Sequence, residues 1–167
     1  MAQTVRFRLD DDASAELTAL RDRLRASGVP VPAQPPAVTV AAAATVPAAA
    51  RAALAAELRV LTLPALWLVT LGTGPGREDE LVLAAVVDAE VLAVHAAVHD
   101  ALAGRVRGPV AAYLPGSWLP HCVLATERPA EAFAVLHPVR PVRARVVGVD
   151  LHDPRTDTTE PVLPGGP

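Results

Sequence analysis

The chain of 167 residues contains no lysine, no isoleucine and no asparagine, and it has a single cysteine, Cys122. One thiol cannot form an internal disulfide, which fits a reducing compartment. Aromatic residues make up only 3 % of the chain, so a core must be built mainly from Val, Leu and Ala. All 15 basic residues are arginine, and with 17 prolines this bias is typical of a high-GC genome.

Charge and hydropathy exclude two classes of large partner. A net charge of −3 argues against an extended nucleic-acid surface, although one or two local donors suffice to hold a single phosphate. The longest apolar run, residues 60–72, is short for a membrane span and contains Pro64. The first twelve residues carry charges where a signal peptide needs an apolar segment. We therefore expect a soluble, cytoplasmic protein with no membrane contact.

The pattern of apolar residues predicts ten elements in the order β-α-β-α-β-β-α-β-α-β. The expected strands are residues 4–9, 37–43, 60–72, 81–87, 119–125 and 140–153, and the expected helices are 10–28, 46–59, 88–104 and 127–139. A similar strand-then-helix rhythm in 37–59 and 121–137 indicates two related halves. We expect an α+β, two-lobed domain of pseudo-symmetric βα repeats around a central cleft, with mainly antiparallel sheets. It spans residues 1–152, and 153–167 are expected to form a disordered tail.

Two of these strands each contain one polar residue in an apolar run. "PAVTV" at 36–40 contains Thr39, and "PHCVL" at 120–124 contains His121. Residues i and i+2 of a strand point to the same side, so Thr39 shares a side with Ala37, and His121 shares one with Val123. Cys122 then points the other way, into the core, which argues against a Cys–His catalytic pair.

The two segments resemble the 2H phosphoesterase superfamily, the 2′-5′ RNA ligase-like proteins and cyclic phosphodiesterases. That family is named for two His-x-Thr/Ser motifs, one on a strand of each lobe. Ala37 stands where the first motif has its histidine, and Val123 stands where the second has its hydroxyl. The resemblance covers roughly residues 1–150, mostly as element order. It implies a cleft in which one imidazole acts as general base, the other protonates the leaving oxygen, and the hydroxyls hold the phosphate.

Carried over residue by residue, the resemblance assigns catalytic positions to His121 and Thr39 and implies neither a metal nor another cofactor. With one histidine absent, it implies a degenerate member that has weak or lost cyclic phosphodiester hydrolysis and binds a nucleotide or cyclic phosphate. Whether the chain is an enzyme stays open. One alternative is a non-catalytic interaction or scaffold protein whose cleft is closed or faces a partner. Another is an active esterase in which a different group replaces the missing imidazole.

Further candidate residues lie outside the two motifs. Arg6 with Arg8, on the first strand, and Arg143 with Arg145, on the last, alternate with apolar residues. Either pair is a candidate to bind phosphate through forked hydrogen bonds, or else forms a solvated strand face. His95 and His99 have the i, i+4 spacing that can hold a metal, but no third ligand is evident. We expect these two histidines to pack at the edge of a helix.

Overall fold

The computed structural model describes residues 1–74 and 76–163, and these residues form an α+β fold with one large antiparallel sheet. The strands are β1 (Gln3–Leu9), β2 (Ala37–Thr45), β3 (Ala65–Gly74), β4 (Arg77–Ala85), β5 (Arg107–Pro109), β6 (His121–Ala125), β7 (Val142–Asp153) and β8 (Thr158–Leu163). The helices are α1 (Asp11–Ala26), α2 (Ala48–Leu58), α3 (Ala89–Leu102) and α4 (Pro129–Leu136), with a short 3₁₀ helix, η1 (Ala111–Tyr113). The predicted α+β class and mainly antiparallel pairing are confirmed.

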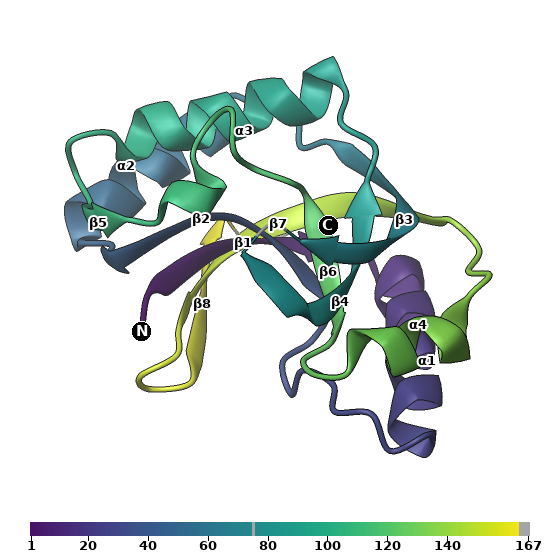
Figure 1. Ribbon diagram of the computed structural model, residues 1–167. Coiled ribbons are helices and arrows are strands. Elements are labelled where there is room, and N and C mark those ends of the chain that lie inside the picture. Colours follow the sequence, from purple (N-terminus) through teal and green to yellow (C-terminus); the bar gives the residue numbers. More distant parts are fainter. Residues whose placement is uncertain (75, 164–167) are drawn as a thin grey trace.

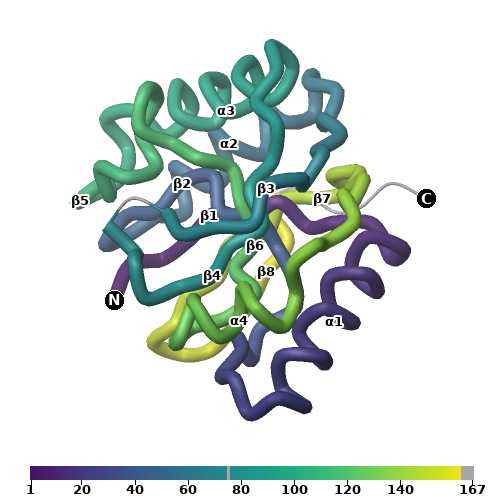
Figure 2. Tube along the Cα trace, turned by 45° about the vertical axis from the view of Figure 1, so that its right-hand side comes forward, coloured from purple at the N-terminus to yellow at the C-terminus, as the bar shows by residue number. Residues whose placement is uncertain are grey.

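Eight strands join in the order β5-β2-β1-β7-β3-β4-β6, and β8 pairs with β7. Every pairing is antiparallel. Figures 1 and 2 show α2 and α3 side by side over one part of the sheet and α1 beside α4 over another. Strands β2 and β6, which carry the two motif segments, lie near opposite ends of this strand order.

The core consists mainly of Val, Leu and Ala, which come from both regions of the sheet and from all four helices. Phe7 is the aromatic side chain of the core, and it is fully buried between Val5 and Leu9 on the inner face of β1. Because the polar residues of β1 alternate with these three, the strand pattern expected for residues 4–9 is confirmed.

The C-terminal segment differs from the expectation of a disordered tail. Thr158–Leu163 form β8, which pairs with the end of β7, and the ring Nδ1 of His152 lies 3.0 Å from Thr159 Oγ1. The prediction is thus wrong for residues 153–163, because free backbone groups along β7 make even a polar, Thr-rich segment a stable edge strand. Residues 164–167 of the predicted tail lie outside the described residues.

Other boundaries also differ from the prediction, among them that of the fourth strand, which begins at Arg77 rather than at residue 81. The third strand begins at Ala65, after Pro64, whereas residues 60–64 lie outside it. The segment 105–118, expected to be a loop, contains β5 and η1. The sequence "GTGPG" at 72–76 predicts a hairpin turn, but residues 72–74 belong to β3 and β4 begins at Arg77. Pro75 lies outside the described residues. Within the described part of the chain, the helices are all too short or too polar to span a membrane.

Candidate functional site

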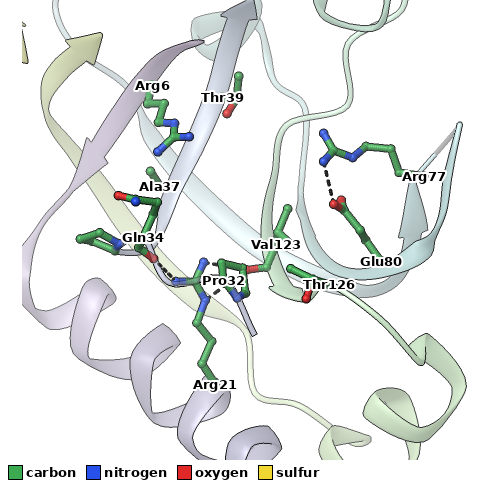
Figure 3. A pocket seen from close by; sticks show the side chains of 11 residues that line it. Arg6, Arg21, Pro32, Gln34, Ala37, Thr39, Arg77, Glu80, Val123 and Thr126 are labelled. Carbon is green, nitrogen blue, oxygen red and sulfur yellow. Dashed lines mark hydrogen bonds and ion pairs between the residues drawn. The ribbon is translucent and has the colours of Figure 1, made fainter. Parts of the chain in front are cut away.

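The two motif strands border one pocket of about 220 Å³. Strands β1 and β2 form one wall, β4 and β6 form the other, and residues 32–35 with one side chain from α1 close the lower end (Figure 3). The residues that line it are Arg6, Arg21, Pro32, Gln34, Pro35, Ala37, Thr39, Arg77, Glu80, Val123 and Thr126. The pocket brings together segments that lie as far apart in the chain as β1 and β6.

Alternation along the motif strands determines which side chains reach the pocket. Val38 and Val40 are fully buried in the core, so Ala37 and Thr39 point the other way and line the pocket. On β6, Cys122 is fully buried and Val123 lines the pocket. The expectation that Cys122 points into the core is confirmed. Ala37 and Val123 give the pocket two apolar positions where the family motif has a histidine and a hydroxyl.

His121 lies on the same side of β6 as Val123 but is not among the side chains that line the pocket. Its Nδ1 is 2.7 Å from the carbonyl oxygen of Leu119, so the neutral ring carries its proton on Nδ1 and a lone pair on Nε2. Burial lowers the pKa of His121; the carbonyl and Glu80 oppose this shift, and Arg77 adds to it. At neutral pH the ring is therefore uncharged and able to accept a proton or hydrogen bond at Nε2.

Two arginines direct their guanidinium groups into the pocket from opposite walls. Arg6, on β1, lies beside Thr39, and its Nε donates to Thr4 Oγ1 at 2.8 Å (Figure 3). Arg77, at the start of β4, lies on the far side; its Nη2 is 2.6 Å from Glu80 Oε1, and its Nη1 donates to Tyr113 Oη at 3.1 Å. Although burial lowers the pKa of Arg6, a guanidinium keeps its proton near neutral pH. Both groups are cations in the same pocket.

Arg21 has a different role, because its donors bind backbone oxygens. The side chain extends from α1 and is only 5 % exposed. Its Nε and Nη2 donate to the carbonyl oxygen of Val123 at 3.2 and 2.7 Å, and its Nη1 donates to that of Gln34 at 2.6 Å. One guanidinium thereby holds β6 at a fixed distance from the segment that leads into β2.

The other three arginines predicted to bind phosphate lie outside this pocket. Arg8 forms an ion pair with Asp150, with an N–O distance of 3.3 Å. Arg143 lies over the ring of Trp67, 5.2 Å from its centroid. Arg145 lies 3.6 Å from Asp10, and its side chain is 80 % exposed. Of the four arginines suggested by strand alternation, Arg6 alone reaches the pocket that Thr39 lines.

Two histidines of α3, His95 and His99, contact the segment 113–118 and strand β2. His95 Nε2 is 2.8 Å from the carbonyl oxygen of Tyr113, and its ring stacks on Trp118 at a centroid distance of 4.0 Å. His99 Nε2 is 3.0 Å from the carbonyl oxygen of Val40, and Trp118 Nε1 donates to that of Thr39 at 2.9 Å. Over residues 1–74 and 76–163, no group of three or more His, Cys, Asp or Glu side chains could hold a metal ion.

Sequence reasoning missed Arg21, Arg77 and Glu80. A signal for Arg21 was present, since it follows Leu17 by four residues and precedes Leu24 by three, on the buried face of α1. Arg77 and Glu80 lie in "GREDE", a charged stretch that the sequence pattern indicates as a turn but that forms the first part of β4.

No protein-family model and no curated protein matches this chain. The chemistry of the pocket is therefore inferred from its own residues. Two guanidinium groups and the Thr39 hydroxyl are suited to a small anion with several oxygens, of which phosphate is the commonest in cells. A single neutral imidazole lies nearby, and the position opposite it in the motif pattern is Ala37, which cannot transfer a proton.

Proposed function

We propose that this protein binds a small phosphate-bearing molecule, a nucleotide or a cyclic phosphate, in the pocket between β2 and β6. The observation that carries the proposal is the convergence of Arg6, Arg77 and Thr39 on one pocket. A guanidinium presents parallel N–H donors that match two oxygens of a phosphate, and a hydroxyl donates to a third. The three arginines and the glutamate among the lining residues argue against a cleft closed by apolar side chains, as the scaffold alternative requires.

The arrangement of elements supports a 2H phosphoesterase-like origin with two related lobes around a cleft. When the short β5 and η1 between α3 and β6 are set aside, the units β1-α1-β2-α2 and β4-α3-β6-α4 have the same order of elements. In each unit the two strands pair antiparallel. A two-fold rotation that exchanges the units would turn the pair α1–α4 into the pair α3–α2, which are the helix pairs that pack together. Such a rotation would also exchange β2 with β6, the two motif strands.

Catalysis by this pocket should be weak or absent. A positioned acid–base group typically contributes about 10²–10⁴ to a rate, and cleavage of a cyclic phosphodiester uses two of them. His121 can supply one, through its free Nε2. Ala37 cannot supply the other. We therefore place cyclic phosphodiester hydrolysis below that of a two-histidine enzyme by about 10²–10⁴.

Calorimetric titration with adenosine 2′,3′-cyclic monophosphate and inorganic phosphate tests the binding role. We expect Arg6→Ala to weaken binding strongly, because Arg6 has guanidinium donors in the pocket. Arg143→Ala is the matched control, since it removes the same charge from the outer face near Trp67. Equal binding by wild type and Arg6→Ala would refute the proposal. Turnover of the cyclic nucleotide and of 2′-5′-linked dinucleotides, beside His121→Ala, measures any remaining catalysis.

One observation favours a second function, an interaction protein. Trp67, Val86 and Val87 are 48, 46 and 43 % exposed, and Val86 N–H bonds to the carbonyl oxygen of Trp67, so the three lie together. Sedimentation at increasing protein concentration tests self-association through this surface. Association that Trp67→Ser abolishes would support an interaction role, whereas a monomer at all concentrations would argue against self-association there.

A further inference from the structure

Glu80 has a carboxylate oxygen without a hydrogen-bond donor. The residue lines the pocket from β4, and its side chain is 12 % exposed. Oε1 accepts from Arg77, whereas Oε2 is buried and has no partner in the described part of the chain. A buried charged acceptor without a donor is unfavourable, so a pocket wall that contains one is suited to a ligand that brings the donor.

We infer that the pocket selects a phosphomonoester with a hydroxyl on the adjacent carbon, as in a nucleoside 3′-monophosphate, and that Glu80 accepts a hydrogen bond from that hydroxyl. This inference rests on the proposed binding of phosphate in the same pocket. It adds a specificity-determining residue, Glu80, and predicts that the open monoester binds more tightly than the cyclic diester.

The hydrogen bonds within the pocket indicate how a ligand would replace Arg77 as the partner of Glu80. A phosphate oxygen competes with Glu80 Oε1 for Arg77, whose side chain is 44 % exposed and lines the same pocket. The carboxylate then loses its donor at Oε1 as well. Once released from Arg77 it can rotate about its last bond, so that either oxygen accepts from a hydroxyl beside the phosphate. A 2′,3′-cyclic phosphate has both oxygens esterified to phosphorus and offers no such hydroxyl.

The net charge of the lining residues also favours a phosphomonoester over a cyclic phosphodiester. The pocket is lined by Arg6, Arg21 and Arg77 against one carboxylate, that of Glu80, which leaves a surplus of two positive charges. A phosphomonoester carries about −1.5 to −2 at neutral pH, whereas a cyclic phosphodiester carries a single negative charge. His121 adds no charge, because burial lowers its pKa. The monoester therefore neutralises the pocket more completely.

Calorimetric titration with adenosine 3′-monophosphate and 2′-deoxyadenosine 3′-monophosphate tests the inference, since the two ligands differ only in the hydroxyl. We expect wild type to bind the ribonucleotide about tenfold more tightly, the difference that a hydrogen bond to a charged group provides. Adenosine 2′,3′-cyclic monophosphate should bind more weakly than the ribonucleotide. Equal binding of the first two ligands, with both dependent on Arg6, would overturn the inference and leave the proposed function standing. Binding of none of the three would overturn both.

Variants locate the effect at Glu80. Glu80→Ala should bring the ratio of the two affinities close to one, while the deoxynucleotide binds as well as before or better because Arg77 is released. General damage to the fold would weaken the binding of both nucleotides and leave the ratio of their affinities unchanged. Asp79→Asn is the matched control, since it removes a carboxylate from the exposed neighbouring position of β4 and should keep the wild-type ratio. A ratio that persists in Glu80→Ala would refute the role of Glu80.

Discussion

Replacing Arg21 by methionine should destabilise the protein more than any substitution of a surface arginine. Methionine keeps most of the length and volume of the side chain but donates no hydrogen bonds. The carbonyl oxygens of Val123 and Gln34 would then lose their charged donors in a partly buried position. No buried charge would be left behind, because the variant removes the cation itself.

The magnitude follows from the two carbonyl groups. Each buried acceptor left without a donor costs about 1–3 kcal/mol, which gives about 2–6 kcal/mol for the pair. Relief from burying the guanidinium offsets part of this, so we expect a loss of about 2–4 kcal/mol. Domains of this kind unfold with about 5–15 kcal/mol, so the loss is a large fraction of the total stability.

Urea unfolding followed by circular dichroism measures the change. Arg21→Met should lower the midpoint without changing the slope of the free energy with denaturant concentration. Arg25→Met is the control on the same helix; its side chain is 60 % exposed, and the change should stay within about 0.5 kcal/mol. If Arg21→Met were no less stable than Arg25→Met, the idea that Arg21 holds β6 beside the segment before β2 would be refuted.

Two other predictions follow from the site. Ala37→His combined with Val123→Thr should raise hydrolysis of 2′,3′-cyclic nucleotides by about 10²-fold, because the double variant supplies a second acid–base group and a second hydroxyl. A folded double variant without any gain in steady-state turnover would contradict the motif alignment. Burial lowers the pKa of His95 and His121 below the value of the unfolded chain, about 6.5, so the unfolded chain binds more protons below that pH. The free energy of unfolding should therefore fall as the pH drops from about 7 to 5, and His95→Gln should show a smaller fall in urea midpoint; an identical pH dependence in both proteins would contradict this assignment.

Local patterns in the sequence were sufficient to predict most of the fold. Alternation identified the inner face of β1, and helical spacing identified α1, α3 and α4 close to their observed bounds. Alternation alone also predicts that Cys122 points into the core, opposite to His121 and Val123, and its burial confirms this. One helical detail differs: the i, i+3 spacing of Leu92 and His95 predicts one shared side of α3, but Leu92 is 50 % exposed whereas His95 is buried.

Features that depend on contacts between distant segments could not be predicted in this way. Strand β8 has little apolar pattern of its own, and it forms because β7 offers unpaired backbone groups. Arg77 lies in β4 because it pairs with Gly74 at the end of β3, and Glu80 follows in the same strand. Strand alternation proposed four arginines for phosphate, yet only the curvature of the sheet and the pairing of its strands determine that Arg6 reaches the pocket.

The absence of lysine from this chain has a consequence for how the pocket responds to pH. Its positive charge comes from Arg6, Arg21 and Arg77, and guanidinium groups do not release their protons at any pH a cell experiences. For the proposed phosphomonoester ligand, the pH dependence of binding should therefore follow the ionisation of the ligand, whose phosphate gains its second charge near pH 6. The positive charge of the three arginines thus stays constant, while the charge of the ligand changes with pH.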